Sequence, residues 1–284
     1  MQLRTILPGQ KQSFKIKNSM MSNTFNRRRF GLLLKKTLLE KRMQMFGFTG
    51  LIFLFILIVY YLIKTFVNFQ VAQNFSFLWG LVGGDFILAA FVFNYFGSNA
   101  NGSSYLTLPV SNFEKWLCAV VIAGIFYPLV FLLFYRIMDA SFVASYHNSL
   151  DPNGPFYKIR YDAVYIYSFM GRLSRQCYPM FLVFSGSMLI GSLYFNKVAL
   201  VKVALLICIL CFGIYGLNYL FASLMFKNID DAFPFQHVAI LVGKEVGSVE
   251  LPKNVHDPIW YFMNYGLPVV LLAVAFIRLR EKEF

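Results

Sequence analysis

The sequence predicts an all-α membrane protein with six transmembrane helices, and three observations support this fold class. Hydrophobic residues make up 58% of the 284 residues and charged residues only 14%, whereas a soluble domain carries about 25% charged residues. The mean hydropathy is +0.60. The apolar residues also fall into runs of about 18 residues or more, long enough to cross a hydrocarbon core of roughly 30 Å. These features exclude an ordinary water-soluble enzyme and a disordered chain.

The positive charge is concentrated in the N-terminal arm. Residues 1–45 contain 11 of the 26 Lys and Arg residues and one of the 13 Asp and Glu residues. We expect residues 1–26 to be a disordered basic arm. Residues 27–45 have the pattern of an amphipathic helix on the cytoplasmic membrane surface, or of a frayed extension of the first span. Because this arm precedes a span, we expect it to contact anionic lipid rather than nucleic acid.

Six apolar segments are predicted to cross the membrane. They cover residues 46–66, 77–97, 116–136, 177–195, 203–226 and 258–278. An even number of spans puts both termini on one side, and the basic arm and the C-terminal RLREKEF tail favour the cytoplasm. Residues 46–284 are therefore predicted to form one transmembrane domain in a multi-pass protein.

Two long segments are predicted to lie outside, at residues 137–176 and 227–257. The first contains the Tyr-rich string YDAVYIYSFM, which is typical of a helix at the membrane interface. The second contains a moderately apolar piece, residues 232–243, that is too short to span. We expect this piece to be re-entrant or to lie flat on the outer surface.

Motifs for covalent chemistry are missing from the sequence. There is no phosphate-binding G-x-x-x-x-G-K-[ST] loop, no H-E-x-x-H and no G-x-S-x-G. The three histidines lack metal-ligand spacing, and the C-x-x-C pair Cys208 and Cys211 lies in an apolar run, where buried structural thiols are expected. We therefore expect no catalytic residue, metal or cofactor in this chain.

Asp85 is the one acidic residue near the middle of a predicted span. A charge at that depth costs a few kcal/mol, so such residues are candidates for function. One interpretation is a proton or cation relay, or a partner for Arg172 or Arg175. The other is that the span begins near Gly84, which would leave Asp85 at an aqueous edge or as a helix cap.

The segment GSSYLTLPVSNFEKWL, residues 102–117, contains a predicted helix start. Ser111 and Glu114 have the spacing of a capping box, and Pro109 fixes the entry to the helix. With Leu106, Leu108 and Phe113 around it, this start has the features of a docking element for a soluble partner. A short loop that caps the third span is the alternative interpretation.

Three strings resemble permease subunits of bacterial ABC transporters of the ABC-2 type. They are RRFGLLLKKTLLEK in the arm, YLTLPVSNFEKWL between spans two and three, and IRLREKEF at the C-terminus. The loop is similar to the family pattern LPxSxxEKxL at Leu108, Pro109, Ser111, Glu114, Lys115 and Leu117. Within this resemblance, the residues expected to couple to an ATPase are Leu108, Pro109, Ser111, Phe113, Glu114 and Lys115.

The resemblance implies an elbow helix, six spans, cytoplasmic ends and a location in the bacterial inner membrane. It implies a second permease chain, identical or different, and a separate ABC ATP-binding subunit that binds ATP and Mg²⁺. It also implies re-entrant helices between spans five and six. We expect the permease subunit of an ATP-driven exporter. The alternatives are a non-transporting membrane anchor or regulatory subunit, and a secondary transporter that uses Asp85.

Overall fold

The structure, a computed structural model, describes residues 25–40, 42–93, 108–195, 198–242 and 245–282. Six of its helical segments are long and apolar enough to cross a membrane. They are Arg42–Phe66, Phe69–Val92, Asn112–Asn148, Arg172–Tyr194, Ala199–Met225 and Lys253–Glu281. The prediction of six such helices is confirmed, and the finding supports a multi-pass membrane protein. Most of the predicted disordered arm lies outside the described residues.

The first helix, α1 (Arg27–Glu40), is amphipathic and lies against the bundle. It buries Leu33 and Thr37 on one side and exposes Lys35 and Lys36 on the other, because residues four apart share a helical face. It is shorter than the predicted elbow. Residues from Arg42 onward belong to α2 (Arg42–Phe66), which is the first membrane-crossing helix.

The second and third membrane-crossing segments are each built from three consecutive helical pieces. The second comprises α3 (Phe69–Leu78), the π-helical segment η1 (Trp79–Gly83) and α4 (Gly84–Val92). The third comprises α6 (Asn112–Val121), η3 (Ile122–Phe126) and α7 (Tyr127–Asn148). Both begin before their predicted starts, and α7 continues well past the predicted end at residue 136. The predicted end of the second span, at residue 97, lies outside the described residues.

Two of the three described π-helical segments end two residues before a proline. Tyr127-Pro128 follows η3, and Leu267-Pro268 follows η4 (Phe262–Gly266). Proline has no N–H to donate to the carbonyl four residues earlier, so a wider turn fits there. The third segment, η1, contains Gly80 and Gly83 instead. All three segments contact α9 (Arg172–Tyr194), the central helix of the bundle.

The segment between α7 and α9 is only partly helical. Helix α8 (Tyr157–Ala163) ends where Val164 adopts an extended conformation with a φ of −123°. The prediction of an interfacial helix across the Tyr-rich string is therefore wrong beyond Ala163. Residues 164–171 instead run along the bundle, where Val164 and Tyr167 are buried.

A three-stranded antiparallel sheet stands where a re-entrant or flat segment was expected. It follows α10 (Ala199–Met225) and has the order β1 (Ile229–Phe233), β2 (His237–Val242) and β3 (Glu245–Glu250). Phe233 pairs with His237, so a three-residue loop joins β1 and β2, and Phe235 has a left-handed φ of 62°, as such loops require. Helices α11 (Lys253–Tyr261), η4 and α12 (Leu267–Glu281) complete the chain.

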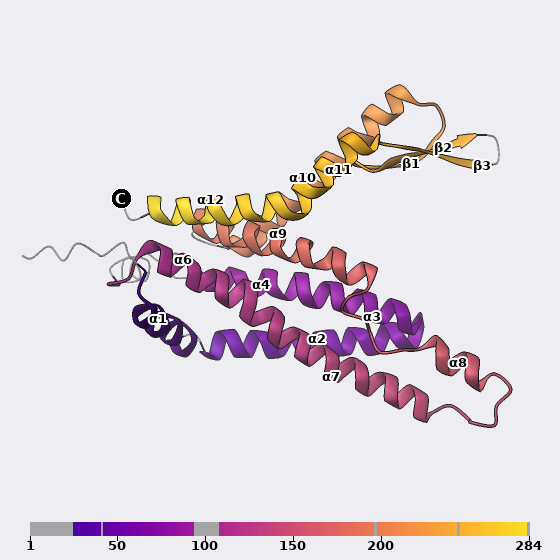
Figure 1. The fold of residues 1–284 in the computed structure, drawn as a ribbon, viewed down its shortest axis with the longest axis horizontal. Coiled ribbons are helices and arrows are strands. Elements are labelled where there is room, and N and C mark those ends of the chain that lie inside the picture. Colours follow the sequence, from indigo (N-terminus) through magenta and orange to yellow (C-terminus); the bar gives the residue numbers. More distant parts are fainter. Residues whose placement is uncertain (1–24, 41, 94–107, 196–197, 243–244, 283–284) are drawn as a thin grey trace, which may run out of the picture.

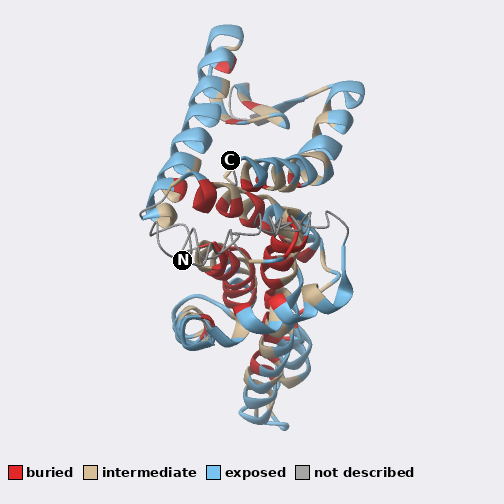
Figure 2. Cartoon of the chain, turned by 90° about the vertical axis from the view of Figure 1, so that its left-hand side faces the viewer, coloured by how far each residue is buried: buried red, intermediate tan, exposed pale blue. Residues whose placement is uncertain are grey.

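The core lies among the middle helices, whereas α10, the sheet and α11 are mostly exposed. Figure 2 shows buried residues concentrated in the centre of the bundle and exposed residues along the outer helices. Within an apolar 18-residue window, 56% of the residues are buried in the segment Phe69–Val92 and 6% in α10. Cys208 and Cys211 on α10 are exposed, so the expectation that they are buried thiols is wrong.

Figure 1 shows how the two ends of the molecule differ. Helix α1, the start of α6 and the end of α12 lie at one end, here called the α1 end. Helix α8 and the three-stranded sheet lie at the opposite end, here called the sheet end. An even number of membrane-crossing helices produces this arrangement, in which α1 and the C-terminal helix end share one side.

Candidate functional site

The predicted capping box at the start of α6 is present. The Ser111 Oγ accepts a hydrogen bond from the Glu114 backbone N–H at 3.2 Å, and Glu114 Oε2 accepts one from the Ser111 N–H at 2.8 Å. Two N–H groups at the helix start, which have no partner within the helix, are thereby satisfied. This part of the prediction is confirmed.

Glu114 also joins α6 to α1, a contact that the sequence pattern did not reveal. Its Oε1 accepts a hydrogen bond from the backbone N–H of Asn26 at 2.7 Å and forms an ion pair with the Arg29 guanidinium at 3.3 Å. The Glu114 side chain is fully buried. The carboxylate therefore serves as an internal link between the two helices rather than as a surface charge.

The predicted coupling residues divide into exposed and buried groups. Pro109 and Phe113 are exposed, and Leu108 is half-buried. Ser111, Glu114 and Lys115 are buried, so these three side chains are not available for direct contact with a partner in this structure. Leu106 lies outside the described residues.

Trp116 connects the same helix to α12. Its indole N–H donates a hydrogen bond to the Leu272 carbonyl at 3.0 Å. Phe113, Trp116 and Phe276 form an aromatic cluster with ring centroids 5.6–6.3 Å apart. Helix α6 is thus attached to α1 through Glu114 and to α12 through Trp116.

Asp85 lies well inside the second membrane-crossing segment, at the start of α4. Its side chain is fully buried, and neither carboxyl oxygen has a hydrogen-bond partner. The interpretation of Asp85 as an edge residue or helix cap is wrong, because η1 and α3 precede it without a break in the helix. No ion pair of the described residues joins it to Arg172 or Arg175, and the Arg175 Nε donates to the Met170 carbonyl instead.

A second buried aspartate, Asp139 on α7, was not singled out from the sequence. Its Oδ1 accepts hydrogen bonds from the Tyr60 hydroxyl at 2.7 Å and the Gln73 amide at 2.9 Å. Its Oδ2 accepts one from the Tyr167 backbone N–H at 2.7 Å. One carboxyl group therefore connects α2, α3, α7 and the segment 164–171.

Further contacts fix the segment 164–171 against the bundle. Arg136 donates a hydrogen bond to the Tyr167 carbonyl at 3.0 Å, and its guanidinium lies 4.2 Å from the centre of the Phe169 ring. Ser174 donates to the Tyr167 hydroxyl at 3.1 Å. Burial raises the pKa of the Tyr167 phenol to about 12, so the hydroxyl is neutral at physiological pH.

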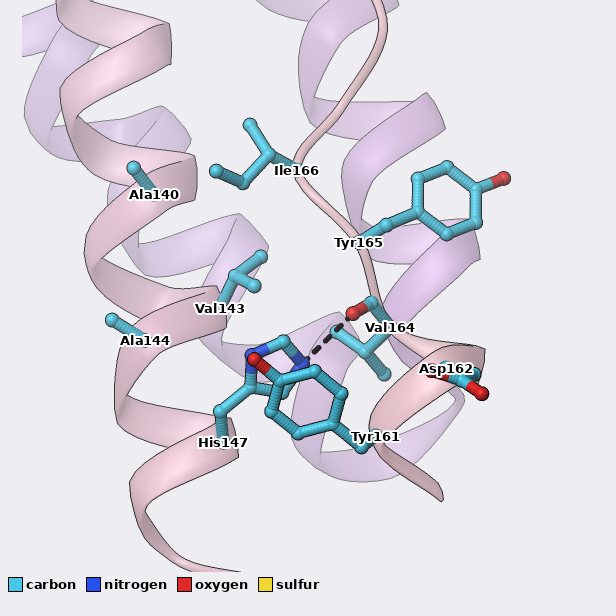
Figure 3. Close-up of a pocket in the computed structure, with 9 residues that line it drawn as sticks. All are labelled: Ala140, Val143, Ala144, His147, Tyr161, Asp162, Val164, Tyr165 and Ile166. Carbon is cyan, nitrogen blue, oxygen red and sulfur yellow. Dashed lines mark hydrogen bonds between the residues drawn. The ribbon is translucent and has the colours of Figure 1, made fainter. Parts of the chain in front are cut away.

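A cavity of about 480 Å³ opens between α7 and the segment 161–166. Figure 3 shows the small side chains of Ala140 and Ala144 on one wall and Tyr161 against His147 at one end. The His147 Nε2 lies 2.9 Å from the Val164 carbonyl, and its ring stacks on Tyr161 with centroids 3.8 Å apart. Asp139 does not line this cavity, and its carboxyl oxygens already accept three internal hydrogen bonds.

Comparisons with protein-family models, with curated proteins and with solved structures return no match.

Proposed function

We propose that this protein is the membrane-spanning permease subunit of an ATP-driven ABC exporter in a bacterial inner membrane. A separate ATPase subunit would hydrolyse ATP, and this chain would convert the resulting movement into passage of cargo. The observation that carries the proposal is the capped start of α6, which lies at the α1 end with Pro109 and Phe113 exposed beside it.

The contacts of α6 provide a physical route for such coupling. A force on Pro109 and Phe113 would reach α1 through the Glu114 carboxylate and α12 through the Trp116 indole. Helix α12 packs along α9, which also contacts α4 and the π-helical segments. A displacement at one surface point would therefore bias the packing of several membrane-crossing helices at once.

Pro109 and Phe113 have a different task from Glu114 in this proposal. The two exposed residues would touch the ATPase, whereas buried Glu114 would transmit the force to α1. Phe113→Asp should therefore weaken binding of the ATPase. Glu114→Gln keeps the size of the side chain but weakens its attraction to Arg29, so it should leave binding intact and reduce the stimulation of ATP hydrolysis.

The experiment is to purify the tagged full-length chain with its ATPase and to measure ATP hydrolysis by the complex in proteoliposomes. Phe156→Asp is the matched control, because Phe156 is an exposed phenylalanine at the sheet end. We expect Phe113→Asp to reduce co-purification and Phe156→Asp to leave it unchanged. The double variant Ser111→Pro and Glu114→Arg should abolish stimulation.

Two outcomes would contradict the proposal. One is a protein that functions without any ATP-hydrolysing partner. The other is a complex in which the double variant retains full association and stimulation. A stable complex that shows no nucleotide-dependent change of conformation would indicate an anchor or regulatory subunit instead.

A further inference from the structure

We propose that Asp85 is a proton-binding site inside the helical bundle, which holds its proton while α4 and α9 are packed together as they are in this structure. The site takes a proton rather than a metal ion or an organic ligand. The inference does not depend on the identity of the ATPase or on the proposed export function.

The first support is the complete burial of an unpartnered carboxyl group. Asp85 has no exposed surface, and neither oxygen accepts or donates a hydrogen bond. A carboxylate in an apolar interior without donors or a counter-charge is unfavourable by several kcal/mol. The neutral acid avoids this cost, so the observed packing selects the protonated form.

The second support is the absence of a countercharge on the helices that surround the site. Helices α2, α9 and α10 and the segment η3 pack against α4. The charged residues of α2, α9 and α10 lie in their terminal turns: Arg42, Lys64, Arg172, Arg175 and Lys202. The Tyr127 phenol lies close enough to Asp85 for the two groups to interact electrostatically.

Tyr127 does not supply a hydrogen bond to the carboxyl group. Its hydroxyl donates to the Gly80 carbonyl at 2.6 Å. Ser185 on α9 is a polar side chain close to Asp85, but the distances and angles place neither Asp85 oxygen in a hydrogen bond. The described residues therefore place no positive charge at this carboxyl group, and a bound proton is what neutralises it.

The third support is the helical irregularity on either side of the site. Asp85 follows η1 by two residues, and Tyr127 directly follows η3. When a π-helical turn moves along a helix, the residues it passes rotate by about 100° around the helix axis. Such a shift in α4 would rotate Asp85 out of its present packing against α9, and we propose that the carboxyl group then meets water. The proton would then move from the carboxyl oxygen to a water molecule, leaving a carboxylate and a hydronium ion.

The test compares infrared spectra of the full-length wild-type and variant proteins in lipid nanodiscs at about pH 7. At this pH, exposed carboxyl groups are ionised. We expect the wild-type protein to show the C=O stretch of a neutral carboxyl group. Asp85→Asn should remove this band, whereas Asp139→Asn, the matched control at the other buried aspartate, should leave it.

A measurement without substitutions covers the case in which a variant does not fold. In wild-type protein with ¹³C-labelled aspartate, the neutral C=O band should shift to lower frequency. The proposal is overturned if this band is missing, if it does not respond to the label, or if Asp85→Asn removes carboxylate absorption instead.

Discussion

Two fully buried aspartates in the same bundle have opposite surroundings. Asp139 accepts hydrogen bonds from α2, from α3 and from the backbone of the segment 164–171. Asp85 has no hydrogen-bond partner for either carboxyl oxygen. The comparison shows that burial alone does not define the role of an intramembrane acid. The donors around Asp139 make it a structural connection, whereas their absence leaves Asp85 able to exchange a proton.

The largest effect is expected from removing the acceptor of the Asp139 network. Asp139→Ala removes the acceptor of three internal hydrogen bonds, and we expect a loss of about 3 kcal/mol in the free energy of unfolding. Thermal unfolding in detergent, followed by tryptophan fluorescence, measures the change. Asp162→Ala is the control, because Asp162 is exposed; equal effects of the two substitutions would refute a structural role for Asp139.

The packing next to Asp85 gives the second prediction. A Cβ atom on Gly84 would clash with the Tyr127 hydroxyl, so Gly84→Ala should cost about 2 kcal/mol. In a Tyr127→Phe background this penalty should fall, because the clashing oxygen is removed. Gly50→Ala on α2 is the control, since no atom lies within 4 Å of the added Cβ there. A similar penalty at both glycines would show that α4 does not approach Tyr127 closely.

Removing one donor from Asp139 should have a smaller effect. Tyr60→Phe deletes the hydroxyl that lies 2.7 Å from the Asp139 Oδ1 and leaves the other two donors in place. We expect a loss of about 1 kcal/mol in the same unfolding assay. Tyr61→Phe, which removes a hydroxyl from an exposed neighbour, should have no measurable effect.

The smallest effect is expected at Asp85 itself. Asn has nearly the same shape as a neutral Asp side chain, and no hydrogen bond is lost. Asp85→Asn should therefore change the free energy of unfolding by no more than about 0.5 kcal/mol. Asp139→Asn should be clearly more destabilising, because an amide nitrogen would face hydrogen-bond donors. The reverse order of the two variants would invalidate the comparison of the two aspartates.

Local patterns explain what the sequence could predict. The membrane-crossing helices are recognisable because each contains a long apolar run, and the capping box because Ser111 and Glu114 are three residues apart. The other partners of Glu114 are separated from it by 88 residues at Asn26 and 85 at Arg29. No local pattern contains such contacts, so the buried link to α1 could not be predicted.

Asp139 and the sheet were missed for two different reasons. The predicted third span ends at residue 136, a charged arginine, but a helix does not have to end where the membrane does. The continued spacing of Phe131, Tyr135 and Asp139 along one helical face is the signal that extends α7. In the sheet, a short apolar run such as HVAILV is equally compatible with a helix and a strand until its pairing is known.

The uninterrupted helical segment Asn112–Asn148 has a mechanical consequence. Its 37 residues correspond to a length of about 55 Å, well beyond the hydrocarbon thickness of roughly 30 Å. The capping box lies at one tip of this rod and His147 beside its cavity at the other. Because one helical segment contains both features, a tilt of its capped end would be accompanied by movement of His147 and of the α7 wall of the cavity at the other end.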